Sequence, residues 1–137
     1  ESPYRSAHFV TQKIISGALK CSRNKSHKIT IGNIDIARDW GWAEEYIDAI
    51  QLITNSNIVK DHLICTGIST TLKRFIEITF NKLDLNWKDH IQSNKKLFRK
   101  SEILNSYGNP LQLKKDLNWE PIINIEEIIE RLIEDHI

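Results

Sequence analysis

The sequence predicts a small α/β domain that is mostly helical and has only a few short strands. Two patterns predict this class. Apolar residues recur at the spacing of one helix face in several segments. Between them, short β-branched runs stop at a glycine, as Ile29–Ile31 stops at Gly32. The 137 residues suit one domain and are too few for two with separate cores, so we expect residues 1–137 to form a single domain.

The first half is expected to contain two helices with a strand between them. Residues 8–23 predict a helix because their apolar side chains fall on one face: Phe9, Val10, Ile14, Ala18 and Cys21. A basic stretch over residues 20–28 leads to the strand Ile29–Ile31, which runs into a turn at Gly32 and Asn33. Residues 43–54 predict the second helix, with apolar residues at helical period and acidic residues on the other side.

The second half begins with the same alternation. A strand is expected over residues 62–66, ended by Gly67, and Ser69 is placed to cap the helix that follows. Residues 85–101 are polar, basic and without period. They predict an exposed connection that carries at most one short strand.

Two further helices are expected near the end of the chain. Pro110 begins a short helix that runs to Leu117. Asn124 and Glu127 form a capping-box pattern at the start of the last helix. Its inward face is expected to consist of Ile125, Ile128, Ile129, Leu132 and Ile133.

Composition argues against several function classes. Lys and Arg number 19 against 18 for Asp and Glu, a net charge of +1, so we expect neither a nucleic acid nor an anionic membrane as partner. No apolar run approaches the roughly 20 residues that cross a bilayer, and no apolar leader opens the sequence. The histidines lack ligand spacing, so no metal is expected. Cys21 and Cys65 are expected to be small buried side chains, which fits the reducing cytoplasm.

The densest cluster of polar and aromatic residues is residues 32–42, Gly-Asn-Ile-Asp-Ile-Ala-Arg-Asp-Trp-Gly-Trp. It lies between a strand and a helix, where α/β layers usually meet their ligands. Arg38 is suited to clamp a phosphate with two N–H groups, with Asp39 orienting it or capping the next helix. The alternative is structural: Asp39 caps the helix, Trp40 lies in the core and Arg38 is a surface charge.

The second cluster is Phe-Arg-Lys-Ser-Glu at residues 98–102. Arg99 is suited to a phosphate, and Glu102 to sugar hydroxyls at the other end of the same ligand. Lys13 is a third candidate cation, and all three residues are also consistent with solvated surface charges. Basic and aromatic residues alternate over 87–99, as on platforms for single-stranded nucleic acid, but the balanced overall charge argues against that class.

Several short segments follow one another in an order typical of a known enzyme family. They are Glu-Ser-Pro-Tyr-Arg at 1–5, Phe-Val-Thr-Gln-Lys at 9–13, Gly-Asn-Ile-Asp at 32–35, Arg-Asp-Trp-Gly at 38–41, Cys-Thr-Gly at 65–67, Phe-Arg-Lys-Ser-Glu at 98–102 and Leu-Asn-Trp-Glu-Pro at 117–121. Together they resemble the C-terminal portion of the GDP-mannose 4,6-dehydratases, extended members of the short-chain dehydrogenase/reductase superfamily. The resemblance spans nearly the whole chain.

The resemblance implies roles for eight residues. In that family the arginine of the first segment lies near the phosphate-bearing ribose of NADP, a role that falls on Arg5. The other seven are implied to bind the GDP-sugar: Val10 and Lys13 at one wall, Gly32 and Asn33 beside the base, Arg38 and Arg99 on the diphosphate, and Glu102 on the ribose hydroxyls.

The resemblance further implies a cytoplasmic, homo-oligomeric lyase that converts GDP-mannose to GDP-4-keto-6-deoxymannose with NADP. This sequence has no Gly-rich cofactor turn, and none of its tyrosines is followed by a lysine four positions on. We therefore expect no catalytic residue here, a Rossmann half that precedes residue 1, and no activity from the chain alone. Two alternatives stay open: another NAD(P)-dependent nucleotide-sugar epimerase, reductase or dehydratase, and a non-catalytic interaction module that retains the fold.

Overall fold

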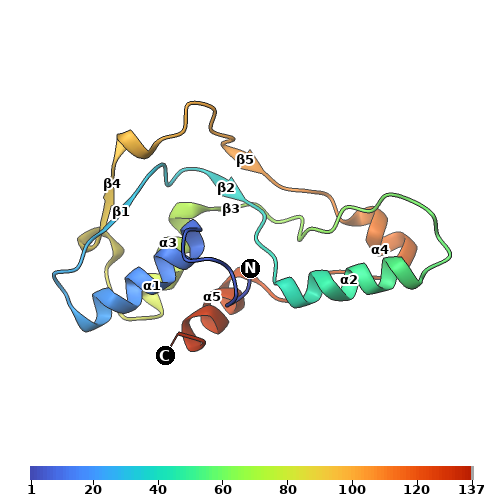
Figure 1. The fold of residues 1–137 in the computed structure, drawn as a ribbon, viewed down its shortest axis with the longest axis horizontal. Helices are drawn as coiled ribbons and strands as arrows, with labels where there is room; N and C mark the ends of the chain where they lie inside the picture. Colours follow the sequence, from blue (N-terminus) through green and yellow to red (C-terminus); the bar gives the residue numbers. More distant parts are fainter. Residues whose placement is uncertain (137) are drawn as a thin grey trace.

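Helices dominate the fold. The computed structural model describes residues 1–136, and within them it has five α-helices joined by short strands and two single turns of 3-10 helix (Figure 1). The helices are α1 (Val10–Arg23), α2 (Ala43–Asn55), α3 (Leu72–Asn81), α4 (Leu111–Leu117) and α5 (Ile125–Glu134), and the 3-10 turns are Trp87–Asp89 and Lys95–Leu97. The predicted fold class, mostly helical with a few short strands, is confirmed.

Short strands in the described part of the chain form two small sheets. The strands are β1 (Ile29–Ile31), β2 (Ala37–Arg38), β3 (Thr70–Thr71), β4 (Ile91–Ser93) and β5 (Asn105–Ser106). β1 pairs in parallel with β4, with Ile29 opposite Ile91. β2 lies between β3, to which it is antiparallel, and β5, to which it is parallel. Each sheet therefore joins a segment of the first half to one of the second half.

The main core lies among α1, α3 and α5, whose predicted apolar stripes face one another. The buried side chains of these helices include Ile14, Ile15, Ala18, Phe75, Ile76, Phe80, Ile128, Ile129 and Leu132. Burying one such large side chain contributes roughly 1.5–3 kcal/mol. Gly17 lets β1 approach α1, because a Cβ at that position would lie 2.5 Å from Cδ1 of Ile29.

The helix caps agree with the sequence in one case and differ in the other. Asn124 Oδ1 accepts the backbone N–H of Glu127 at 2.9 Å, as the capping pattern predicts for α5. The cap of α3 is Thr71, whose hydroxyl oxygen accepts the N–H of Arg74 at 3.1 Å. The prediction of Ser69 was wrong because β3 extends the chain up to Thr71, and the Ser69 hydroxyl donates instead to Asn105 of β5.

Helices α2 and α4 form a smaller unit that we call the α2–α4 lobe, and Figure 1 shows it set apart from α1 and α5. Its buried side chains are Ala49, Leu113 and Trp119, with Tyr46, Ile53, Ile64 and Leu117 packed against them. The Trp119 ring meets the Tyr46 ring edge-on, with centroids 6.3 Å apart. The lobe thus has an apolar centre of its own, much smaller than the main core.

The predicted strand at residues 62–66 is absent from the described fold. No described strand runs through these residues. The N–H groups of Thr66 and Gly67 donate to the carboxylate of Asp39, at 2.9 and 2.8 Å, rather than to a neighbouring strand. Because strand pairing needs a partner segment, the local strand-like pattern of residues 62–66 was insufficient to form a strand here.

The predicted connection over residues 85–101 is more ordered than expected. It carries the one short strand that the sequence allows, β4, flanked by the two 3-10 turns. Leu85 and His90 are buried, so the expectation of an exposed segment was wrong for them. The His90 ring stacks on Phe80 with centroids 5.7 Å apart. This contact joins the segment to the main core.

Cys21 and Cys65 are both buried and both free thiols, in agreement with the prediction of small buried side chains. Burial raises the pKa of each thiol above its usual value, so both are uncharged at neutral pH. No helix within residues 1–136 has both the length and the apolar character needed to cross a membrane.

Candidate functional site

An open hollow of about 700 Å³ lies where the main core meets the α2–α4 lobe. Its walls come from the start of α1, the end of β1, β2, the start of α2 and the segment 97–102. Seven of the eight residues assigned from the sequence line it: Arg5, Val10, Gly32, Asn33, Arg38, Arg99 and Glu102. The fold brings these side chains to one place, while their binding roles stay predictions.

Strand β2 carries Arg38 into the hollow. Its pairing with β3 and β5 fixes the backbone of Arg38 opposite Thr70 and Ser106. The guanidinium Nη2 lies 3.9 Å from Glu102 Oε1, and Nη1 donates to the carbonyl of Ala37 at 2.7 Å. The Arg38 and Glu102 side chains are 27% and 16% exposed, so this ion pair is only partly hydrated. Arg99 lines the same hollow from the exposed segment after the second 3-10 turn.

The end of β1 forms a close-fitting wall. A Cβ on Gly32 would lie 3.0 Å from the carbonyl oxygen of Leu97, so any side chain there would push against the segment that carries Arg99. The Ser93 hydroxyl donates to the carbonyl of Gly32 at 3.2 Å. Asn33 Oδ1 accepts the N–H of Asp35 at 2.9 Å, which fixes the turn after the strand.

Arg5 lies at the rim, ahead of α1. Its guanidinium carbon stands 4.0 Å from the centre of the Phe9 ring, and its Nε is 3.5 Å from Oε1 of Glu1. The side chain is 39% exposed. An arginine over an aromatic face keeps its charge, so the exposed part of Arg5 can pair with an anion.

Lys13 is not among the residues that line the hollow. Its ammonium group donates to the carbonyl of Thr30 at 2.7 Å, and the side chain lies at the surface. Val10 lies one turn earlier on α1 and does line the hollow. The structure therefore separates two residues that the family pattern places on the same wall.

Asp39 is the structural anchor of the site, a role that the sequence interpretation missed. Its carboxylate accepts the N–H groups of Thr66 and Gly67 and the Thr66 hydroxyl at 2.6 to 2.9 Å, with the N–H of Gly108 at 3.5 Å. The expectation that it caps α2 was wrong, because that helix begins after Trp42 without a side-chain cap. Asp39 instead ties the end of β2 to two distant loops.

Tyr46 of α2 closes the side of the hollow nearest the lobe. Burial, reinforced by the nearby carboxylate of Asp39, raises the pKa of Tyr46 far above its usual value. Its hydroxyl is therefore neutral at every physiological pH. A Cβ on Gly41 would lie within 2.5 Å of the Tyr46 ring, so the glycine of the Arg-Asp-Trp-Gly segment makes room for this aromatic wall.

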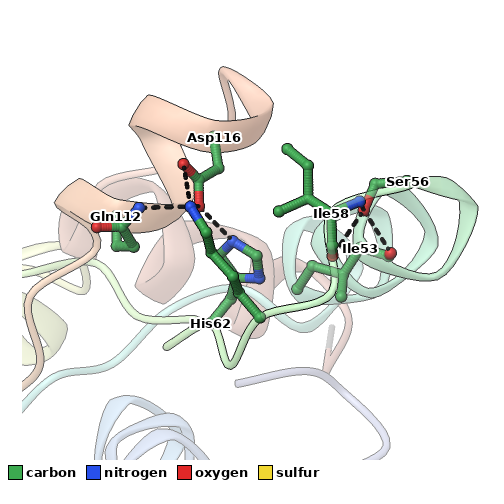
Figure 2. Close-up of polar contacts among 7 residues, drawn as sticks. Ile53, Ser56, Ile58, His62, Gln112 and Asp116 are labelled. Carbon is green, nitrogen blue, oxygen red and sulfur yellow. Dashed lines mark hydrogen bonds and ion pairs between the residues drawn. The ribbon is translucent and has the colours of Figure 1, made fainter.

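A second polar cluster lies outside the hollow, in the α2–α4 lobe. Figure 2 shows the Asp116 carboxylate between the Gln112 amide and the His62 ring, with separations of 2.8 and 3.1 Å, and Lys60 Nζ lies 3.1 Å away. Hydrogen bonding from Gln112, aided by Lys60 and His62, lowers the pKa of Asp116 from 3.8 to about 2. Among the described residues, no three His, Cys, Asp or Glu side chains gather as metal ligands would.

The fold of this chain is shared with part of two solved proteins. RMD from Pseudomonas aeruginosa, solved with NADPH, superposes with a TM-score of 0.80 at 21% identity, covering 98% of this chain and 44% of that one. dTDP-glucose 4,6-dehydratase from Bacillus anthracis, solved with NAD, gives 0.83 at 17% identity, covering 99% and 41%. Both solved relatives hold a nicotinamide cofactor.

The family follows from the sequence match. A family model described as GDP-mannose 4,6 dehydratase matches residues 1–132, and the chain belongs to that family. GDP-mannose 4,6 dehydratase 1 of Arabidopsis thaliana is 33% identical over 135 residues, which make up 98% of this chain and 37% of that protein. The predicted family is confirmed, and the chain spans well under half the length of this relative.

Proposed function

We propose that the hollow binds the nucleotide diphosphate of a GDP-sugar, and that the chain is the substrate-binding part of a GDP-mannose 4,6-dehydratase. The observation that carries the proposal is convergence. Arg38 of β2 lies far in the sequence from Arg99 and Glu102, yet all three line one hollow. Its volume of about 700 Å³ lies within the range of ordinary ligand pockets.

The charges suit the two polar ends of such a ligand. Guanidinium groups present paired N–H donors that match phosphate oxygens, so Arg38 and Arg99 are assigned to the diphosphate. A carboxylate accepts hydroxyl hydrogen bonds, so Glu102 is assigned to the ribose. Beside them, Gly32 and Asn33 are assigned to the base, and Val10 offers apolar surface at another wall.

The residues present fit NADP at one place only. Arg5, a rim cation with 39% of its side chain exposed, suits the phosphate on the cofactor's ribose. When bound, the cofactor supplies the acceptance and return of a hydride. The remaining contacts to it are assigned to the part of the family fold that this chain does not span.

Catalysis is assigned to that same missing part. Proton abstraction in the superfamily needs a tyrosine with a lysine four positions on, and Tyr4, Tyr46 and Tyr107 each lack it. The neutral hydroxyl of Tyr46 serves here as wall rather than as base. The chain alone is therefore expected to bind a nucleotide weakly and to release no keto-sugar.

The first test is titration of the chain with GDP, followed by NMR or calorimetry. Solvated ion pairs contribute about 0–1 kcal/mol each, so a dissociation constant near the millimolar range is expected. Arg38→Ala and Arg99→Ala should each weaken binding several-fold. Lys82→Ala, which removes a cation paired with Glu130 away from the hollow, should leave it unchanged. Equal binding of UDP and GDP, or full binding by both arginine variants, would contradict the proposal.

The second test restores the missing part. The N-terminal half of the Arabidopsis relative is supplied in trans, and NADP-dependent formation of the keto-sugar from GDP-mannose is measured. Activity is expected only when both polypeptides are present. A folded complex that binds both ligands and forms no product would show that the chain has kept the fold without the chemistry.

A further inference from the structure

In the Arg38–Glu102 pair, the negative charge of Glu102 lies beside the guanidinium that is assigned to the phosphate. Nη2 of Arg38 and Oε1 of Glu102 are 3.9 Å apart, and both side chains line the hollow. At the other end of the guanidinium, Nη1 is held by the carbonyl of Ala37. The Nη2 group that faces Glu102 is therefore among the donors left for an incoming anion.

A diphosphate and Glu102 cannot both approach this guanidinium without like-charge repulsion. The pair is only 27% and 16% exposed, so solvent screens it less than a surface pair. Glu102 lies in the segment between the second 3-10 turn and β5, outside any helix or strand. The Leu104 carbonyl accepts the N–H of Ala37 at 2.7 Å, but no described backbone hydrogen bond involves residues 99–103. This stretch can therefore change course without breaking backbone pairing, whereas Arg38 is fixed in β2.

We propose that Glu102 exchanges partners when the hollow fills: in the free chain it neutralises Arg38, and on binding it releases the guanidinium to the diphosphate and accepts the ribose hydroxyls. The inference rests on the proposed function and adds a competition within the site. A ligand with both diphosphate and ribose restores the contact that Glu102 gives up. A bare diphosphate does not, so the exchange selects nucleotides over inorganic pyrophosphate.

The test compares GDP with inorganic pyrophosphate on the 137-residue chain and its Glu102→Gln variant. The glutamine keeps the shape of Glu102 without its charge, so Arg38 is no longer neutralised. The affinity for pyrophosphate should therefore rise about threefold to tenfold, which corresponds to about 0.7–1.4 kcal/mol for a partly buried ion pair. The preference for GDP over pyrophosphate should fall by at least threefold. Glu102→Ala should shift the preference in the same direction, and circular dichroism confirms that each variant is folded.

Two further variants separate exchange from general repulsion. Glu126→Gln removes an acid that also pairs with an arginine, Arg74, but does not line the hollow, and it should change neither affinity. In an Arg38→Ala background, Glu102→Gln should no longer raise the affinity for pyrophosphate, because the released partner is gone.

Three results would overturn the exchange. One is an unchanged pyrophosphate affinity in Glu102→Gln. Another is the same gain in the Arg38→Ala background, which would mean repulsion without pairing. If GDP binds as proposed, either result removes the exchange and leaves the proposed function standing. Failure of the wild-type chain to bind either ligand is the third, and it would remove both.

Discussion

The main core and the α2–α4 lobe are stabilised in different ways. The main core buries complete helix faces, with Phe75, Ile76 and Phe80 of α3 fully excluded from solvent. In the lobe, Trp119 and Leu113 form most of a small apolar centre. The other contacts that hold the lobe together are polar, chiefly those of the Asp116 carboxylate (Figure 2).

The difference predicts that the hollow depends on two units of unequal stability. Val10 of α1 and Leu72 of α3 line it from the main core, and Tyr46 and Ile47 of α2 line it from the lobe. Asp39 lies at the junction and holds the loops that lead into the lobe. Loss of the lobe alone would open the site while most of the helical core stays folded.

The largest expected effect comes from truncating one large side chain in each unit. Phe75→Ala should cost about 3–5 kcal/mol and lower the stability of the whole chain, because Phe75 is fully buried and packs against Trp40 of the hollow. Trp119→Ala should instead release the lobe locally. Hydrogen exchange is the measurement: Phe75→Ala should expose amides of every helix, and Trp119→Ala chiefly those of α2 and α4.

Leu111→Ala on the exposed side of α4 is the matched control, with an expected change below about 0.5 kcal/mol. If Trp119→Ala lowered protection in α3 as strongly as in α4, the two units would unfold together and the comparison would fail.

An intermediate effect is expected from acid. The pKa of Asp116 is lowered from 3.8 to about 2 in the folded chain. As the pH falls, the Asp116 carboxylate therefore takes up a proton at a higher pH in the unfolded chain than in the folded chain. The stabilisation is therefore complete above about pH 4 and is lost as the pH falls through 2. Thermal melts followed through α4 resonances should show the lobe loosening over this interval before the main core does.

Asp116→Asn should remove that pH dependence, since the variant cannot titrate. Asp48→Asn, which changes an exposed acid on α2, should retain it. A lobe that melts identically at pH 4 and pH 2 in the wild-type chain would show that the Asp116 contacts do not hold it.

The smallest effect is expected from an ion pair on the surface of the main core. Arg74 Nη2 and Glu126 Oε1 are 3.2 Å apart, but both side chains are about half exposed. A double-mutant cycle with alanine at both positions should give a coupling of roughly 0.2–1 kcal/mol at low salt, and less in 0.5 M NaCl. A coupling above about 2 kcal/mol would show that polar contacts, like apolar burial, are a main source of the stability of this core.

Helices governed by local periodicity and caps could be predicted from the sequence. The Asn124 cap and the isoleucine stripe of α5 involve residues within a few positions of one another, and both appear in the structure. The same holds for α4, which follows Pro110 as expected. Such elements depend on neighbouring residues, so a sequence window contains the physical cause.

The short strands could not be predicted in the same way. β2, β3 and β5 are two residues long and exist because distant segments meet in register. Residues 62–66 carry a strand-like pattern, yet the described fold gives them no strand partner. A two-residue strand has almost no local signal, whereas its pairing depends on the whole fold.

The residues that line the candidate site were mostly predictable, but the tertiary contacts that hold them in place were not. Charge and motif pointed to Arg38, Arg99 and Glu102, and all three line the hollow. The anchoring role of Asp39 was not predictable, because its partner Gly108 lies 69 positions away. The bond between Lys13 and the carbonyl of Thr30 is likewise a tertiary contact that the family motif does not contain.

The pairing of β1 with β4 has a consequence for the order of folding. The bond from Ser93 to Gly32 closes 61 positions of chain, whereas the packing of α1 against α5 joins segments more than 100 positions apart. Closing a longer loop costs more conformational entropy, so the helical core is not expected to close before this sheet. In a refolding chain the packed interior and the wall that holds Gly32 should therefore form together, and the proposed affinity for nucleotide should appear at the same time as the native helices.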